Sequence, residues 1–296
     1  MTIRPRRSVL YMPGSNARAL EKARTLAADA VILDLEDAVA PDAKAVARQQ
    51  VADAVKAGGF GSREVVIRVN GHATPWYKED VAAAAAAGPD AILVPKVQTP
   101  GDVMRFAKDI REAGAPEHTK LWAMMETPLA ILNADAIART AADPASRLTV
   151  FIMGTNDIAK ETRARLIPGR LPMAAYLSIC VAAARAHGVE IIDGVYNDFS
   201  NEAGLREECE QGRDFGMDGK TLIHPSQVDG ANRAFSATPE AIADAQLIVD
   251  AFAQPEHAGA GVINLQGRMV ERLHLAQAER LLAIDKAIAE RLAGRV

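Results

Sequence analysis

Short apolar runs recur along the chain with segments of helical character between them, and this alternation constrains the fold more than any other feature. Short buried strands that alternate with helices indicate a parallel sheet. The expected strands are 8–12, 30–35, 64–69, 91–94, 121–125, 148–153, 190–194 and 220–223. The helices expected between them are 17–28, 41–56, 78–87, 100–114, 128–140, 172–187 and 205–215.

Eight strand–helix units predict an α/β fold of the (β/α)₈ TIM-barrel type, closed into one catalytic domain over residues 1–235. A doubly wound open sheet is the alternative architecture. It is disfavoured because no glycine-rich turn follows the first strand in the pattern that binds dinucleotides.

Residues 236–296 depart from this rhythm. A helix over 239–253 is followed by a segment rich in Pro, Gly and Ala, a short hairpin over 262–269 and a final amphipathic helix over 274–292. We expect this C-terminal helical and hairpin extension to act as a lid over an active site and as an oligomerisation arm.

The composition excludes several classes of protein. Hydrophobic residues make up 49% and charged residues 24%, which is typical of a soluble globular protein with a sizeable core. A net charge of -4 provides no basic surface for nucleic acid. Two cysteines in 296 residues do not form a disulfide framework. The N-terminus lacks the apolar core of a signal peptide, and no apolar run is long enough to span a membrane, so we expect a cytoplasmic protein without membrane association.

Polar side chains gather at the positions where the expected strands end. The working face of a barrel of this type is formed by the carboxyl ends of its strands, so these residues are expected to share one rim. They are Glu36, Asp37, Arg68, Asn70, Lys96, Glu126, Thr127, Asn156, Asp157 and His224.

Two of these residues are candidate metal ligands. Glu126 and Asp157 each follow an apolar run at the point where a buried strand gives way to a loop. Paired carboxylates at one rim suit a hard divalent cation such as Mg²⁺, because oxygen donors are the ligands it prefers. The alternative interpretation is that each is a helix-capping or loop acid.

Arg68 lies within an apolar strand, where an unpaired cation is costly. It is either a buried ion-pair residue, paired with Glu36 or Asp37, or a fixed cation that holds a carboxylate or enolate oxygen of a substrate. The two interpretations are compatible. Glu36 and Asp37 are expected to pair with Arg68 or Lys96, or to accept hydrogen bonds from waters on a metal ion.

A Gly-Thr-Asn-Asp turn formed by residues 154–157 is a candidate anion cradle. The backbone N–H groups of Gly154, Thr155, Asn156 and Asp157 are suited to a substrate carboxylate. Lys96 and His224 are each as consistent with a structural hydrogen bond as with a ligand contact.

Seven segments in chain order resemble the citrate lyase β-subunit-like CoA ester lyases of the HpcH/HpaI aldolase superfamily, and the resemblance extends over nearly the whole chain. They are residues 8–14, 33–39, 67–70, 95–97, 125–128, 154–157 and 223–225. Within that superfamily the chain looks similar to the malyl-CoA and citramalyl-CoA lyases.

The resemblance implies a magnesium-dependent barrel that cleaves or forms a C–C bond beside a CoA thioester. It assigns Glu126 and Asp157 to the metal and Arg68 to the substrate. Substrate contacts are further implied for Glu126, Lys96 and 154–157, catalytic roles for Arg68, Glu36 and Asp37, and contacts with CoA for Pro13, Lys22, His224 and Pro225.

The C-terminal segment departs from the family pattern at one residue. The CoA lyases tend to have an aspartate that reaches into a neighbouring subunit, and here Glu271 occupies that place, one methylene longer. The resemblance therefore implies a homo-oligomer, a trimer or hexamer that exchanges its lids, with Glu271 as a catalytic acid. The alternative is that Glu271 merely begins the last helix, where an acid is favoured by the macrodipole.

The expected reaction is retro-Claisen or retro-aldol cleavage of a 3-hydroxyacyl-CoA, such as malyl-CoA or citramalyl-CoA, to acetyl-CoA or propionyl-CoA and a 2-oxo acid. Arg68 would stabilise the enolate. The alternatives are a malyl-CoA-type thioesterase on the same scaffold, a citrate lyase β subunit acting on a citryl-acyl-carrier protein, and a non-catalytic barrel, against which the retained Glu126, Asp157 and Arg68 argue.

Overall fold

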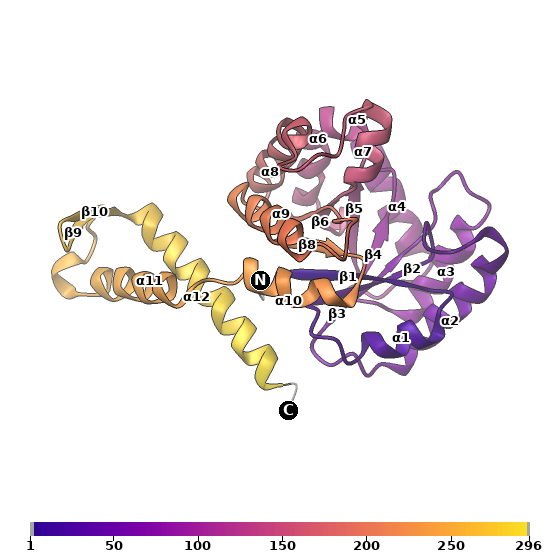
Figure 1. Ribbon diagram of the computed structural model, residues 1–296, viewed down its shortest axis with the longest axis horizontal. Coiled ribbons are helices and arrows are strands. Elements are labelled where there is room, and N and C mark those ends of the chain that lie inside the picture. Colours follow the sequence, from indigo (N-terminus) through magenta and orange to yellow (C-terminus); the bar gives the residue numbers. More distant parts are fainter. Residues whose placement is uncertain (1–2, 295–296) are drawn as a thin grey trace. The chain divides into compact units, whose positions relative to one another are not determined.

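The computed structural model describes residues 3–294, and within them eight parallel strands form a closed barrel in which β1 pairs with both β2 and β8 (Figure 1). This confirms the predicted (β/α)₈ fold. The strands are β1 (Ser8–Pro13), β2 (Ala30–Asp34), β3 (Glu64–Arg68), β4 (Ala91–Val94), β5 (Lys120–Met125), β6 (Leu148–Met153), β7 (Glu190–Asp193) and β8 (Gly219–Leu222).

Alternating residues of the strands face opposite sides of the sheet, and both sides are buried. One set fills the barrel interior around Trp122, whose side chain is fully buried, with Val9, Ile32, Val66 and Leu93 in the same cluster. The other set packs against the surrounding helices. Only the polar residues at the strand ends are therefore free to form a site.

The helices lie around the strands (Figure 1). The α-helices of the barrel are α1 (Ala17–Ala23), α2 (Lys44–Ala57), α3 (Tyr77–Ala87), α4 (Pro100–Glu112), α5 (Pro128–Leu132), α6 (Ala134–Arg139), α7 (Thr155–Thr162), α8 (Ala174–Ala186), α9 (Glu202–Asp214) and α10 (Val228–Ala234). Short 3₁₀ turns are η1 (Pro41–Ala43), η2 (Thr140–Ala142), η3 (Pro144–Ser146), η4 (Leu171–Met173) and η5 (Pro225–Gln227).

Several helix boundaries differ from those expected. The helix predicted over 17–28 ends at Ala23, and the hydroxyl of Thr25 donates to the carbonyl of Lys22 at that end. The helix predicted over 128–140 is broken at Asn133, whose side chain donates to the carbonyl of Gln98. Helices α7 and α10 were not predicted, because both are short and α7 begins in the polar 154–157 segment.

The strand register determines which side chains meet at the rim. Asp34 at the end of β2 lies opposite Arg68 at the end of β3. Met125 at the end of β5 lies opposite Met153 at the end of β6, so the residues that follow these two strands are also neighbours.

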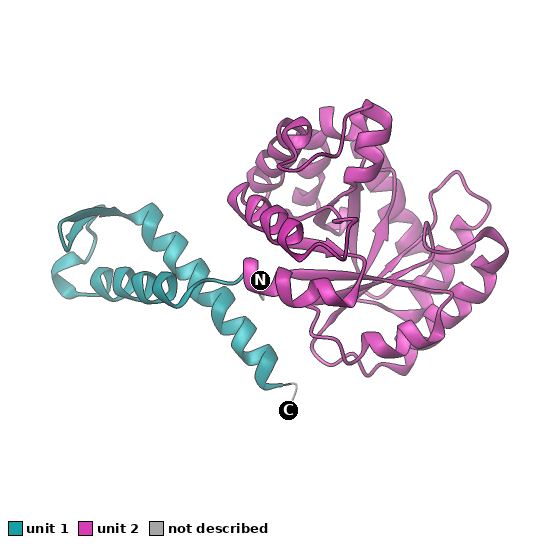
Figure 2. Ribbon diagram, viewed as in Figure 1, with its two compact units in different colours: residues 1–5, 236–296 teal, residues 6–235 magenta. Residues whose placement is uncertain are grey.

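The chain divides into two compact units, residues 6–235 and residues 1–5 with 236–296 (Figure 2). In the second unit α11 (Pro239–Phe252) packs against α12 (Arg272–Ala293). The remaining elements of this unit are the 3₁₀ turn η6 (Pro255–His257) and the strands β9 (Val262–Leu265) and β10 (Arg268–Glu271).

Strands β9 and β10 form an antiparallel hairpin, as the sequence predicts. Gln266 and Gly267 connect them with positive φ angles of 55° and 82°, which matches the twist of a two-residue hairpin turn. Phe252, Ile263 and Val270 form a small core in this unit. No helix of residues 3–294 has the length and apolar character needed to cross a lipid bilayer.

Candidate active site

Arg68 lies at the centre of a group of three carboxylates, and it is 6% exposed. Its Nε and Nη2 atoms donate to the two carboxylate oxygens of Asp34, both at 2.6 Å. Its Nη1 atom lies 2.9 Å from Glu36 Oε2 and 3.1 Å from Asp37 Oδ2. The predicted pairing with Glu36 and Asp37 is confirmed, and the fork-to-fork partner is Asp34.

Sequence reasoning missed two residues of this cluster as partners of Arg68. Asp34 is fully buried and holds the guanidinium bidentately. The ring of Tyr11, from β1, lies 4.9 Å from Arg68 Cζ, a cation–π contact. Asp34 carries a signal that a sequence could reveal, since it is an acid at the end of an otherwise apolar strand. Tyr11 carries none.

The cluster shifts the proton affinities of its two inner acids in opposite directions. Burial would raise the pKa of Asp34, but the Arg68 guanidinium and two backbone N–H donors outweigh it and hold the pKa below its usual value. Burial raises the pKa of Glu36 to about 8, against the attraction of Arg68 and with the repulsion of Asp37. Glu36 is therefore a carboxyl that exchanges its proton near neutral pH.

The other predicted pair, Glu126 and Asp157, converges on a lysine. Lys96 Nζ lies 2.5 Å from Asp157 Oδ1 and 3.6 Å from Glu126 Oε1. The backbone N–H of Lys96 also donates to Glu126 Oε1 at 2.7 Å, from a residue with a positive φ of 54°. The structure thus brings these three predicted residues together.

Glu126 is the buried member of this pair, at 1% exposed. Burial raises the pKa of its carboxyl, and the charge of Lys96 only partly opposes this. Gly154 makes the approach possible, because a Cβ atom at this position would lie 2.3 Å from the Cβ of Glu126. Glu126 is held tightly against the turn that leads to Asp157.

The donor set suits magnesium. Glu126 and Asp157 converge on one cationic group, the Nζ of Lys96, so their oxygens are already placed around a common positive charge. No group of three or more His, Cys, Asp or Glu side chains in residues 3–294 is placed to hold a metal ion. Two carboxylates are nevertheless sufficient for Mg²⁺, which usually keeps several waters and takes further oxygens from its substrate.

The predicted anion cradle is the first turn of a helix. Helix α7 begins at Thr155, so the N–H groups of Thr155, Asn156 and Asp157 precede its first intrahelical bond, which Ile158 donates to Gly154. Such N–H groups favour anions. Asn156 and Asn197 exchange two amide hydrogen bonds of 3.1 and 2.8 Å, which joins this turn to the loop after β7.

The residues implied to contact CoA follow neighbouring strands. Pro13 ends β1, and His224 and Pro225 follow β8, which pairs with β1. His224 caps η5 and stacks on Phe199, with ring centroids 4.9 Å apart. Lys22 is an exposed residue of α1. None of these four joins the clusters around Arg68 and Lys96 through an ion pair or hydrogen bond in the described residues.

Glu271 lies in the second unit. It is the N-cap of α12, and its backbone N–H donates to His274 Nδ1, in the first turn of the helix, at 2.9 Å. The helix-start interpretation of Glu271 therefore has a direct contact in this chain. Its catalytic role remains a prediction.

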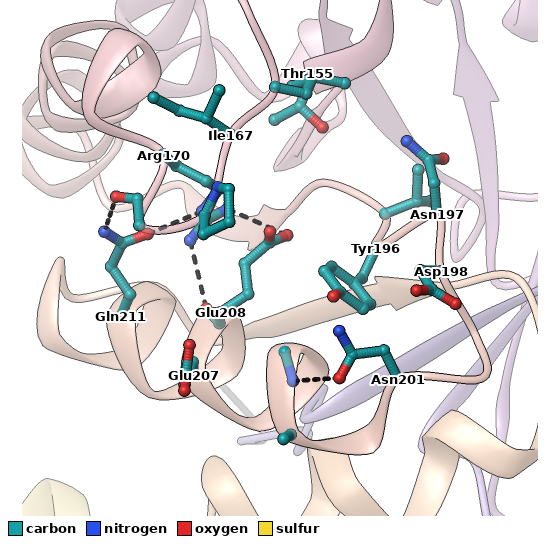
Figure 3. Close-up of a pocket in the computed structure, with 16 residues that line it drawn as sticks. Thr155, Ile167, Arg170, Tyr196, Asn197, Asp198, Asn201, Glu207, Glu208 and Gln211 are labelled. Atoms are coloured by element: carbon teal, nitrogen blue, oxygen red, sulfur yellow. Dashed lines mark hydrogen bonds and ion pairs between the residues drawn. The ribbon is translucent and has the colours of Figure 1, made fainter.

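A cavity of about 470 Å³ lies beside the α7 turn, and sequence reasoning did not foresee it (Figure 3). Its walls come from Thr155, the loop of residues 166–170, the loop after β7 and one face of α9. Arg170, Glu208 and Gln211 lie together on one side, and Tyr196, Asn197 and Asp198 lie on another (Figure 3).

A second buried ion cluster borders this cavity. Asp193, the last residue of β7, accepts from Arg170 Nη1 at 2.7 and 2.8 Å and from Lys220 Nζ at 3.0 Å. Lys220 Nζ also donates to Glu208 Oε1 at 2.7 Å and to the carbonyl of Gly194 at 2.6 Å. We call this group the closed cluster, because Asp193 and Lys220 are fully buried and Arg170 is 3% exposed. Its fourth member, Glu208, lines the cavity, and its side chain is 16% exposed.

Comparison with known proteins gives several relatives of similar length. The chain is 51% identical over 285 residues to a (3S)-malyl-CoA thioesterase of Cereibacter sphaeroides (strain KD131), with 96% of each chain covered. It is 32% identical over 289 residues to the citrate lyase subunit beta of Leuconostoc mesenteroides subsp. cremoris, which covers 96% of this chain and 94% of that relative.

Solved structures with the same fold extend this relationship. One is CitE from Mycobacterium tuberculosis in complex with magnesium, acetoacetate and coenzyme A, at a TM-score of 0.75 and 27% identity, covering 96% of this chain and 98% of that one. Another is RipC from Yersinia pestis, at a TM-score of 0.68 and 27% identity, covering 82% and 100%. The model of the HpcH/HpaI aldolase/citrate lyase family matches residues 7–225. The chain belongs to the HpcH/HpaI aldolase/citrate lyase family.

Proposed function

We propose that this protein is a magnesium-dependent thioesterase that hydrolyses a malyl-CoA-type substrate to free CoA and the hydroxydicarboxylic acid. The observation that carries the choice of reaction is the 51% identity to a (3S)-malyl-CoA thioesterase across 96% of both chains, against 32% to a citrate lyase subunit beta. This identity supports hydrolysis over the C–C cleavage that the family resemblance implied.

Arg68 is the group that supports the chemistry. In thioester hydrolysis a water loses one proton as its oxygen adds to the thioester carbon, and the carbonyl oxygen becomes an oxyanion. The carbonyl then re-forms, the C–S bond breaks, and the sulfur takes up that proton, which leaves a carboxylic acid and a free thiol. A guanidinium fixed by Asp34 stabilises that oxyanion without reorganising. Glu36, with a pKa raised to about 8 by burial, is placed to carry a proton beside it.

Glu126 and Asp157 would hold the metal ion. Bound Mg²⁺ would supply Lewis-acid polarisation of the substrate's oxygens. The N–H groups of Thr155 and Asn156 at the start of α7 would bind the distal carboxylate of the substrate. Lys96, which bridges the two acids, would supply a further positive charge to that carboxylate.

CoA itself would lie along the β1 and β8 side of the rim. Pro13, His224 and Pro225 follow these paired strands, and Lys22 lies exposed on α1 with a charge suited to a phosphate. CitE from M. tuberculosis, which shares the fold, was solved with magnesium and coenzyme A together.

A second candidate is C–C cleavage of the same substrate class, and the citrate lyase relatives favour it. The substrate's 3-hydroxyl would lose its proton, the C2–C3 bond would break, and a 2-oxo acid and a thioester enolate would result. Arg68 serves this reaction equally, because negative charge again develops on the thioester oxygen. A citrate lyase β subunit would instead require a citryl-acyl-carrier protein.

A product assay separates these reactions. The purified protein, Mg²⁺ and (3S)-malyl-CoA should release free thiol, detected with a thiol reagent, without a 2-oxo acid, detected as its phenylhydrazone. Release of the 2-oxo acid with acetyl-CoA would identify the lyase. Turnover of citryl-acyl-carrier protein alone would identify the citrate lyase subunit, and absence of turnover with both substrates would overturn the proposal.

We further propose a homo-oligomer, a trimer or hexamer, in which Glu271 of one subunit reaches the site of another. The exposed apolar residues Val262, Met269 and Leu273 support it, because they need a surface to bury against. Glu271→Ala and Arg68→Ala subunits, dissociated and reassembled together, should regain part of the activity. Mixed oligomers without any recovery would remove the shared site, and full activity of Glu271→Ala alone would remove the catalytic role.

A further inference from the structure

Lys44, the first residue of α2, is a buried lysine that forms no ion pair with a carboxylate in residues 3–294. It is 6% exposed. Its Nζ donates to the carbonyl oxygens of Leu35 at 2.8 Å and Glu36 at 2.7 Å, and lies 5.2 Å from the centre of the Trp76 ring. Because a buried ammonium needs hydrogen-bond acceptors and this one uses two successive carbonyls, we expect Lys44 to stabilise that turn of the backbone.

The carbonyl of Leu35 also receives a second donor. Asn70, which follows β3, donates from Nδ2 to Leu35 O at 2.8 Å. Asp80 of α3 orients this amide, because it accepts from Asn70 Nδ2 at 2.6 Å and from the backbone N–H of Asn70 at 3.1 Å. Arg48 of α2 in turn donates to Asp80 at 2.8 Å. Through Arg48 and Asp80, the outer helices α2 and α3 thus fix the Asn70 amide that binds the turn after β2.

That turn carries the acids that face Arg68. The N–H groups of Glu36 and Ala38 donate to the two oxygens of Asp34, at 2.9 and 3.0 Å. These bonds close the chain into a loop, from which the Glu36 and Asp37 side chains return to one Nη1 atom of Arg68. Lys44 donates to Leu35 O, which is on the same peptide as the Glu36 N–H, and to Glu36 O, which is on the next peptide, so the loop is held from both sides.

We propose that Lys44 is a positioning residue, which sets the Glu36–Asp37 loop against Arg68 and thereby orients the guanidinium for the charge that develops on the thioester oxygen. The proposal rests on the proposed function for its consequence in catalysis, but not for the loop geometry. Without the ammonium, two buried carbonyls lose a charged donor and the loop can leave Arg68. A fixed guanidinium is worth more to an oxyanion than a mobile one.

The test compares Lys44→Met with Lys56→Met, a matched control on the same helix whose side chain is exposed. With (3S)-malyl-CoA and saturating Mg²⁺, Lys44→Met should lower kcat by about 10- to 100-fold with KM changed by less than about threefold. Lys56→Met should match the wild type. Lys44→Arg, which restores a charged donor, should regain part of kcat.

Amide hydrogen exchange supplies a readout that does not need activity. In Lys44→Met the amides of residues 36–39 should exchange faster, while those of β5 and β6, which hold the other acid pair, should keep wild-type rates. Unchanged exchange in 36–39, or a wild-type kcat, would overturn the proposal. Faster exchange throughout the barrel with kcat reduced only as far as folded protein is lost would overturn it in favour of a structural role.

A double-mutant comparison of Lys44 with Arg68 provides the second part of the test. If Lys44 acts through Arg68, then Lys44→Met in an Arg68→Lys background should reduce kcat by much less than it does in the wild type. Fully additive losses would contradict the proposed route. If the wild type turns over no CoA thioester at all, the proposed function fails, and the exchange rates of residues 36–39 still decide whether Lys44 holds the loop.

Discussion

Two clusters of ionisable side chains lie beside the barrel strands, and they are organised in opposite ways. The rim cluster spans β2 to β6, and the closed cluster lies at β7 and β8 beside the cavity. In the described residues the rim cluster has two cations and five carboxylates, and the closed cluster has two of each. The members are Arg68, Lys96, Asp34, Glu36, Asp37, Glu126 and Asp157 in the first, and Arg170, Lys220, Asp193 and Glu208 in the second.

The difference indicates what each cluster is for. In the closed cluster two cations face two carboxylates, so the charges balance. The attraction between Asp193 and Lys220 offsets the cost of burying them, which suits a structural role. In the rim cluster the acids outnumber the cations, and burial raises the pKa values of Glu36 and Glu126. An excess of buried carboxylate is compensated by protons or by a further cation, and both are what the proposed chemistry requires.

Glu126→Gln should have the largest effect, because it removes a metal ligand while keeping the shape of the side chain. We expect kcat/KM to fall by on the order of a thousandfold and Mg²⁺ affinity, measured by calorimetry, to fall with it. The melting temperature without metal should stay close to the wild type, since the change relieves repulsion with Asp157. Normal Mg²⁺ binding and turnover would show that the rim cluster is not a metal site.

Arg68→Lys should come next, because lysine keeps the charge but loses the fork that Asp34 holds. We expect kcat/KM to fall by about a hundredfold while Mg²⁺ still binds. Circular dichroism serves as the control for folding. If the variant is simply unfolded, Arg68 has a structural role like the residues of the closed cluster, and the proposed difference between the two clusters is wrong.

Asp193→Asn tests the other side of the comparison. It leaves the buried Arg170 and Lys220 with only Glu208, so the free energy of unfolding should fall by roughly 3–5 kcal/mol, measured by urea denaturation. Activity per folded molecule should stay within about twofold of the wild type. Adding Lys220→Met should restore part of the stability, because it rebalances the charges. A large loss of kcat in a folded variant would show that this cluster takes part in catalysis.

The two clusters also show which features of the site can be predicted from the sequence and which cannot. Asp34 and Asp193 stand in nearly the same local setting, an acid at the end of an apolar strand, and nothing local separates their roles. Their cations come from 34 and 23 residues away along the chain, at Arg68 and Arg170. Arg170, the partner of Asp193, is a loop residue with a positive φ of 48°, and the periodicity of the sequence does not predict such a conformation.

The barrel was predictable because its strands are short apolar runs that repeat, and the rim was predictable because parallel strands place their ends together. The pairing of Glu126 with Asp157 followed from those two facts alone. The 3.6 Å and 2.5 Å contacts to Lys96 did not, because they depend on the left-handed backbone at Lys96. Loop conformation, rather than fold, is where sequence reasoning ends in this chain.

The smallest expected effect is a difference in the pH dependence of stability between wild type and Glu36→Gln. Burial raises the pKa of Glu36 to about 8, so between its unfolded pKa and that value the folded state binds the proton more tightly than the unfolded state. Stability in a chelator should therefore decrease as pH rises through this window. Glu36→Gln should remove roughly 1–2 kcal/mol of that decrease between about pH 5.5 and about pH 7.5, measured by urea denaturation at each pH.

Asp37→Asn, at a side chain that is 71% exposed, removes a repulsion that helps to raise the pKa of Glu36, so it should flatten the slope only in part. Added Mg²⁺ should flatten the wild-type slope, because a cation at the rim favours the ionised carboxyl. Identical slopes for wild type and Glu36→Gln would mean that the rim carries no uncompensated acid, and that the two clusters differ in exposure rather than in charge balance.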